Sequence, residues 1–127
     1  TANGVNSLYS NTLGEYNVAV GSSSLYNNTT GTRNTAVGSG ALNYNSTGSF
    51  NTSTGFNSLY NNTTGTNNSA YGFQSLFSNT TGIYNSALGH GSLYSNTTGN
   101  SNTATGYTSL YFWRISISEV ETSILTC

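Results

Sequence analysis

Few side chains in this sequence could carry out acid–base or nucleophilic chemistry. The chain has one histidine, His90, no aspartate and no lysine, and its glutamates are Glu15, Glu119 and Glu121. Catalysis needs an acid, a base or a metal ligand with partners within reach. His90 stands beside a repeated glycine at a position of varying residue type, which indicates a solvent-facing side chain. The many serines lack a histidine partner to activate them, so the sequence predicts a protein that is not an enzyme.

Metal and cofactor sites are not indicated either. Calcium-binding solenoid repeats place aspartates in their turns, and this chain has none. Glu119 and Glu121 could share one strand face, but a carboxylate pair alone is a weak signal. The single Cys127 cannot form an internal disulfide, and we interpret it as an incidental residue, the alternative being a link between two chains. We therefore expect no catalytic residue, no metal and no cofactor.

Charge and hydropathy exclude two classes of partner. Charged residues make up 4% of the 127 residues, the formal net charge is −1, and the only cations are Arg33 and Arg114. Nucleic-acid binding needs clustered Lys and Arg to contact phosphates. No apolar run approaches the roughly 20 residues of a membrane-spanning helix. We expect neither nucleic-acid binding nor membrane insertion.

The chain is built from an uninterrupted repeat of 17 residues. One glycine series is Gly4, Gly21, Gly38, Gly55, Gly72, Gly89 and Gly106, and a second is Gly14, Gly31, Gly48, Gly65, Gly82 and Gly99. Leucine recurs at Leu8, Leu25, Leu42, Leu59, Leu76, Leu93 and Leu110. An aromatic residue follows it at Tyr9, Tyr26, Tyr60, Phe77, Tyr94 and Tyr111, with Asn43 as the exception. These two series are the leucine column and the tyrosine column.

Asparagine recurs at two further positions of the repeat. The first asparagine ladder is Asn11, Asn28, Asn45, Asn62, Asn79 and Asn96, and the second is Asn17, Asn34, Asn51, Asn68, Asn85 and Asn102. We expect the amides of each ladder to bond to their copies in the coils above and below, as in other cross-β stacks. We expect the glycines to hold turns with positive φ.

A fixed period without insertions means that each unit repeats one structural turn. Helical repeats are longer, about 33 to 47 residues, and Gly, Asn, Thr and Ser disfavour helices. The phrases SLY and NTAV, bounded by Gly and Asn, are typical of short strands joined by turns. The sequence predicts an all-β fold, a parallel β-solenoid or β-roll of seven 17-residue coils, over residues 1–111. Each coil would contain two strands and two turns.

Strand alternation predicts which side chains face inward. With Leu59 inside, Ser58 and Tyr60 point outward, so the tyrosine column becomes an exposed apolar stripe. Such stripes usually mark association, and we interpret this one as a lateral contact between chains. The alternative is that the rings fold back over the coil and complete its core.

The repeat ends at the segment 112–127, which begins at Phe112. Ile115 and Ile117 alternate with serines, which predicts a strand. Three interpretations are open: a cap over the seventh coil, a strand exchanged with the next subunit, or a segment foreign to the repeat.

Glycosylation sequons are frequent. They begin at Asn27, Asn28, Asn45, Asn51, Asn61, Asn62, Asn67, Asn79 and Asn96. An asparagine cannot both carry a glycan and stack in a buried ladder. The candidate acceptors outside the ladders are therefore Asn27, Asn61 and Asn67.

The phrases NTAVGSGAL (34–42) and NSALGHGSL (85–93) resemble the repeats of trimeric autotransporter adhesin heads. The repeat unit as a whole, with the approximate consensus NTAVG…ALYNNTTG, also resembles repeats of phage tail fibres and large bacterial surface proteins. The resemblance covers residues 1–111 and implies a parallel β-roll on an extracellular or virion surface. The 17-residue coil departs from the adhesin heads, whose coils commonly have about 14 residues.

These observations favour an extracellular structural protein that associates with itself into a fibre, stalk or filament. One alternative is an adhesin head that binds surface glycans or a host surface through outward Tyr and Asn. A lower-ranked alternative is an ice-binding solenoid that uses threonine pairs such as Thr63 and Thr64. Disorder, common in polar low-complexity chains, is disfavoured by the unbroken leucine column.

Overall fold

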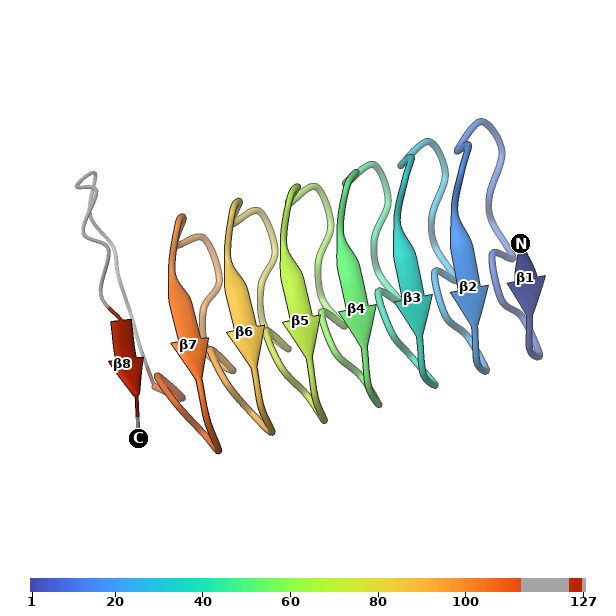
Figure 1. The fold of residues 1–127 in the computed structure, drawn as a ribbon. Helices are drawn as coiled ribbons and strands as arrows, with labels where there is room; N and C mark the ends of the chain where they lie inside the picture. Colours follow the sequence, from blue (N-terminus) through green and yellow to red (C-terminus); the bar gives the residue numbers. More distant parts are fainter. Residues whose placement is uncertain (113–123, 127) are drawn as a thin grey trace.

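The protein is a parallel β-solenoid. A computed structural model describes residues 1–112 and the backbone of 124–126. The strands are β1 (Ala2–Asn3), β2 (Val18–Val20), β3 (Thr35–Val37), β4 (Thr52–Thr54), β5 (Ser69–Tyr71), β6 (Ser86–Leu88), β7 (Thr103–Thr105) and β8 (Ile124–Thr126). They form one parallel sheet in chain order, and the coils lie side by side along the stack (Figure 1).

The strand register follows the 17-residue repeat. Ala19 lies opposite Ala36, Ala36 opposite Ser53, and Ser53 opposite Ala70. Each coil is numbered here from its first-series glycine, so coil 1 begins at Gly4 and coil 7 at Gly106. Because every coil has the same length, each residue type lands on its copy one rung away. The predicted fold is confirmed for the residues that the structure describes.

Each coil contains one strand, so the prediction of two strands per coil is wrong. The Ser-Leu-Tyr segment is a turn, in which the Asn62 N–H donates to the Leu59 carbonyl at 3.2 Å. All seven leucines of the leucine column have φ between 49° and 53°, a left-handed conformation that costs a side chain roughly 1–2 kcal/mol. The Leu59 N–H still donates to the Ser75 carbonyl of the next coil at 2.9 Å. Bonding between coils therefore offsets the local cost.

The two glycine series differ in backbone conformation, but neither has room for a side chain. Gly38 has φ 131°, as predicted, whereas Gly48 has no positive φ, which corrects the prediction for the second series. A Cβ on Gly48 would collide with the amide oxygen of Asn45 and with the carbonyl oxygen of Gly65. The second series is glycine because another chain segment lies where a side chain would be.

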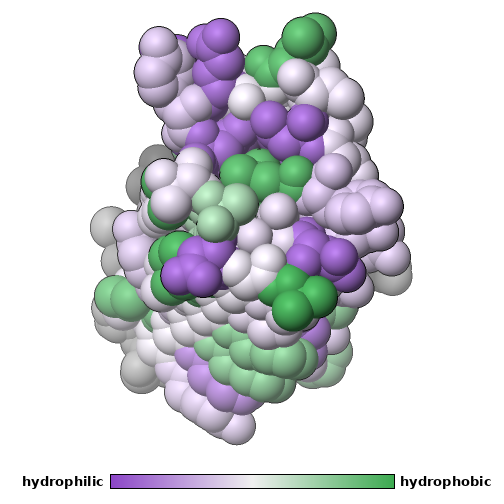
Figure 2. Space-filling model, turned by 90° about the vertical axis from the view of Figure 1, so that its right-hand side faces the viewer, coloured by the Kyte–Doolittle hydropathy of each residue, from purple (hydrophilic) through white to green (hydrophobic). Residues whose placement is uncertain are grey.

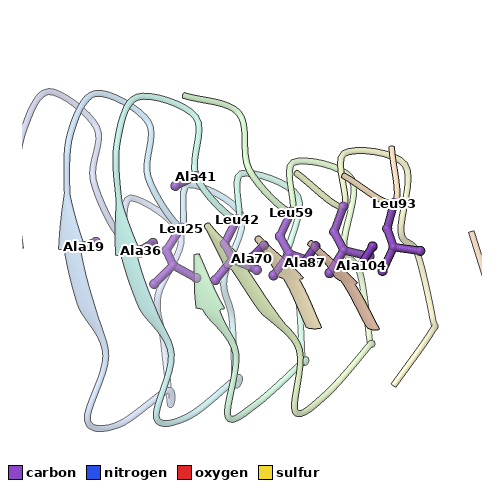
Figure 3. Packing of buried hydrophobic residues seen from close by; sticks show 11 residues of the cluster. Ala19, Leu25, Ala36, Ala41, Leu42, Leu59, Ala70, Ala87, Leu93 and Ala104 are labelled. Carbon is purple, nitrogen blue, oxygen red and sulfur yellow. The ribbon is translucent and has the colours of Figure 1, made fainter. Parts of the chain in front are cut away.

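The core is thin and largely polar. Five leucines (Leu25, Leu42, Leu59, Leu76 and Leu93) are fully buried, and the alanines of the strands lie along the same interior (Figure 3). Leu8 and Leu110, at the two ends of the column, are only partly buried. Among the described residues, eleven apolar and eighteen polar residues are buried. The interior therefore depends on hydrogen bonds as much as on apolar packing.

The C-terminal segment is described only in part. Strand β8 pairs in parallel with β7 of the same chain. The strand predicted around Ile115 and Ile117 lies outside the described residues, as do Arg114, Glu119, Glu121 and Cys127. Across the described part of the chain, no helix is long and apolar enough to cross a bilayer.

Candidate functional site

The first asparagine ladder joins side chain to side chain. Asn62 Nδ2 donates to Asn45 Oδ1 at 2.8 Å and to the Gly65 carbonyl at 3.0 Å. Its own Oδ1 accepts from Asn79 Nδ2 at 2.9 Å. The same pattern continues from Asn11 to Asn96. Both amide hydrogens are used, which ties each coil to its neighbour at one fixed register.

The second asparagine ladder joins side chain to backbone, unlike the predicted bonds from amide to amide. Asn68 Oδ1 accepts from the backbone N–H of Asn85 at 2.9 Å, and Asn68 Nδ2 donates to the Gly82 carbonyl at 2.8 Å. Amide-to-amide bonds join this ladder only near its C-terminal end in the described chain, from Asn85 to Asn68 and from Asn102 to Asn85, each at 3.1 Å. Two columns of one residue type thus bond differently.

The second-series glycines connect the two ladders. The Gly65 carbonyl accepts from Asn62 Nδ2 at 3.0 Å and from Asn51 Nδ2 of the preceding coil at 2.8 Å. Sequence reasoning missed this connection, although its signal is the constant Asn-x-x-Gly spacing of every unit. The carbonyl accepts both bonds because no Cβ keeps the amides away.

The last amide oxygen of the second ladder has no partner within residues 1–112. Asn102 Oδ1 is buried and has no hydrogen-bond partner among the described residues. In each preceding coil this oxygen accepts the N–H of the next asparagine. The chain has no asparagine 17 residues beyond Asn102, where Glu119 stands.

The repeated serines before the leucines are inside the coil, which corrects their predicted outward direction. Ser58 is fully buried, and its Oγ donates to the Gly55 carbonyl at 3.2 Å. Ser53, which replaces alanine in one coil, donates its Oγ to the Ser58 carbonyl at 2.8 Å. Strand alternation failed at Ser58 because this segment is a turn.

The tyrosine column is a stack of rings on the side of the solenoid. Tyr60, Phe77, Tyr94 and Tyr111 stack with centroids 4.6–5.4 Å apart and planes within 9° of parallel. All members except Tyr9 are half-buried. The column is interrupted at Asn43, where Tyr44 instead contacts Tyr60 edge-on at 5.3 Å. Its role in lateral association stays a prediction.

A second aromatic stack follows the first-series glycines. It consists of Phe56, Phe73, His90 and Tyr107, with neighbouring centroids 4.8–5.5 Å apart. All four residues are exposed. His90 is solvent-facing, as expected, but it is also a member of this stack. Sequence reasoning missed the stack because serine occupies the same position in coils 2 and 3.

A third column consists of Tyr16, Arg33, Phe50, Asn67, Tyr84 and Ser101. Its one charged residue, Arg33, lies between two aromatic rings. The Arg33 guanidinium lies 5.3 Å from the Tyr16 centroid and 5.4 Å from the Phe50 centroid. Both distances are within the range of cation–π attraction. A cation therefore replaces an aromatic ring in this column without breaking the contact between coils.

The sequon asparagines differ in accessibility. Asn67 is exposed, and Asn27 and Asn61 are half-buried. Asn27 Nδ2 also donates to the Asn43 carbonyl at 3.1 Å. The other six are buried members of the ladders: Asn28, Asn45, Asn51, Asn62, Asn79 and Asn96. Glycan attachment uses the amide nitrogen, which the buried amides commit to hydrogen bonds.

At the N-terminal end of the solenoid, hydrophilic and hydrophobic residues are interspersed over the surface (Figure 2). Within the described residues, no group of three His, Cys, Asp or Glu side chains could hold a metal ion. What the outer surface offers is aromatic edges, hydroxyls and amides repeated once per coil. Comparison of the chain with protein-family models, with curated proteins and with solved structures returned no match.

Proposed function

We propose that this chain is a structural protein that associates with itself into a fibre, stalk or filament on an extracellular, cell or virion surface. The observation that carries the proposal is the pair of aromatic stacks, each of which places one ring in every coil from coil 4 to coil 7 along the side of a hydrogen-bonded rod. The sequence resemblance to adhesin heads and tail-fibre repeats agrees with this role.

Hydrogen bonds satisfy the inside of the rod, whereas part of its outside is apolar. The ladders satisfy most of the polar interior and hold the coils in register. Large apolar side chains outside the core remain in contact with water, and contiguous apolar surface of this kind usually marks association. Because rings recur over several consecutive coils, weak contacts can act together along the rod.

Glycan binding is the main alternative. A sugar packs on the face of an aromatic ring, but the rings of both stacks cover one another's faces at 4.6–5.5 Å. Ring edges are left for contacts, which favours protein surfaces over stacked sugars.

Ice binding would use the exposed threonines Thr30, Thr47, Thr64, Thr81 and Thr98. They form a single file, since the neighbouring Thr63 donates its hydroxyl to the Thr80 carbonyl.

Electron microscopy of the purified full chain tests the proposal. We expect ordered assemblies whose number grows with protein concentration. Dispersed monomers at every concentration would contradict the proposal. Specific hits on a glycan array would instead support the adhesin alternative, and thermal hysteresis would support ice binding.

A further inference from the structure

One stretch of the outer surface is rich in exposed rings over four consecutive coils. It consists of Phe56, Phe73 and Tyr107, with His90 between them, and of Tyr71 and Leu88, and it is called the outer patch. We propose that a second copy of this chain binds here, outer patch against outer patch. This inference rests on the proposed function and names the surface through which the chains first meet.

The outer patch is continuous along coils 4 to 7. Phe56, Phe73, His90 and Tyr107 are stacked ring on ring. Tyr71 on β5 lies directly opposite Leu88 on β6. Tyr71 and Phe73 are separated only by Gly72, as Leu88 and His90 are by Gly89. Two neighbouring columns therefore form a single apolar surface.

The exposed area suits a protein interface. The five apolar members of the outer patch are 42% to 73% exposed. At about 200 Å² for a large side chain, they leave roughly 500 Å² in contact with water. A standard interface buries about 800 Å² on each partner. The outer patch thus supplies more than half of one side of such an interface, and neighbouring polar residues can complete it.

The boundary of the outer patch indicates a closed pair. In coils 2 and 3 the position of Phe56 and Phe73 is occupied by Ser22 and Ser39. Val5, Val20 and Val37 are also exposed in these columns, but the rings are confined to coils 4 to 7. A row of rings in one half of the rod matches itself when two copies meet across a two-fold axis. Such a contact pairs the outer patches of two copies, and the tyrosine column, the other predicted lateral contact, would join these pairs into a longer assembly.

Charge and spacing favour a second copy over another partner. The two columns contain no charged residue between Val20 and Tyr107, so nothing in them selects a charged ligand. The rings recur at 4.8–5.5 Å, close to the spacing of about 4.8 Å between paired strands. Another copy of the chain carries the same spacing, so its ring edges can meet these ring edges at successive coils of the outer patch.

Sedimentation equilibrium over a concentration series tests this inference. The variant is Phe56→Ser with Phe73→Ser, which gives coils 4 and 5 the serine that coils 2 and 3 already carry. Losing two aromatic anchors from each copy should raise the dimer dissociation constant at least about tenfold. The far-ultraviolet circular dichroism spectrum should be unchanged, since both rings lie outside the core.

The matched control is Tyr84→Ser. Tyr84 is an exposed aromatic outside the outer patch, and Ser101 occupies its position in the next coil with nearly the same φ, 57° against 58°. This control should associate like the unaltered chain. Should the double variant fail to fold, Leu88→Thr takes its place, because Thr105 occupies that position in coil 6.

The outcomes separate the two proposals. If the unaltered chain associates and the double variant associates equally well, the outer patch is not the contact, while the proposed function stands. If the unaltered chain stays monomeric throughout, both proposals fail. If Tyr84→Ser weakened association as much as the double variant, the inference would also be overturned. The chains would then associate through non-specific hydrophobic contacts.

Discussion

The inside of the solenoid repeats almost unchanged from coil to coil, whereas the outside varies. Both asparagine ladders keep the same residue in six coils, and the leucine column keeps it in seven. At the position after the first-series glycines the residues are Val5, Ser22, Ser39, Phe56, Phe73, His90 and Tyr107. The interior must match its copies to satisfy buried hydrogen bonds, but the exterior has no such constraint. Stability should therefore respond to interior changes and association to exterior changes.

The largest expected effect is that of removing an interior amide. In Asn62→Ala, Asn45 Oδ1 and one N–H of Asn79 lose their partners inside the stack. The Gly65 carbonyl keeps its bond from Asn51. Two buried unpaired groups and a small cavity should lower the free energy of unfolding by about 4 kcal/mol. Urea denaturation followed by circular dichroism measures this change.

Asn61→Ser is the control for that prediction. Asn61 is half-buried, and serine occupies the same position in the next coil as Ser78. Its free energy of unfolding should stay within about 0.5 kcal/mol of the unaltered chain. Equal losses for the two variants would show that the interior ladder is no more important than the surface.

The leucine column offers the next largest effect. Leu59→Ala should cost about 3 kcal/mol, because Leu59 is fully buried in the middle of the stack. Leu8→Ala should cost less than half as much, since Leu8 at the end of the column is only partly buried. Thermal unfolding of both variants checks the ratio. A larger loss for Leu8 would contradict the assignment of the core.

The end of the second ladder gives a smaller effect and sharpens the comparison. Asn102→Ala removes an oxygen that has no partner in the described chain. The Asn85 oxygen keeps the backbone N–H of residue 102. The cost should be about 1 kcal/mol, against about 3 kcal/mol for Asn68→Ala, which leaves the buried N–H of Asn85 unpaired. Comparable costs in urea denaturation would mean that Asn102 has a partner of its own.

The smallest effect concerns the tyrosine column at high pH. Burial raises the pKa of Tyr60 above 10.0, and the neighbouring Tyr44 raises it further. The folded chain therefore holds this proton more tightly than the unfolded chain, so stability is complete below pH 10 and falls as the pH rises through the folded pKa. Tyr44→Phe should lower the pKa of Tyr60 in a phenolate absorbance titration. An unchanged or higher value would contradict the coupling.

The sequence is sufficient to predict the period, the parallel stacking and the residues of the interior columns. A repeat without insertions places each residue on its copy, so the 17-residue spacing alone assigns Asn62 and Leu59 to their columns. The turn at Ser58 and Leu59 could not be predicted, because strand alternation assumes an extended backbone. The left-handed φ of Leu59 is stabilised by a bond to the next coil. That bond joins backbone atoms, so the residue types in the sequence do not indicate it.

The role of Gly65 illustrates the same limit. The repeat keeps a constant spacing from Asn62 to Gly65, and a turn with positive φ is the simplest explanation that the residue type offers. The structure instead places the Gly65 carbonyl between two amides from different coils. Whether Gly65 is needed for a positive φ or for lack of space depends on how closely neighbouring coils pack. The residue type alone does not show this.

The most direct test of the account is light scattering through a thermal ramp on Phe56→Ser with Phe73→Ser, beside the unaltered chain. One run reports the particle mass before unfolding and the temperature at which the chain unfolds. We expect a lower particle mass for the variant than for the unaltered chain at the same protein concentration. We also expect the variant to unfold at the temperature shown by the unaltered chain at concentrations too low for association. A variant that stays associated, or that loses its fold together with its association, would contradict the separation of a constant interior from a functional exterior.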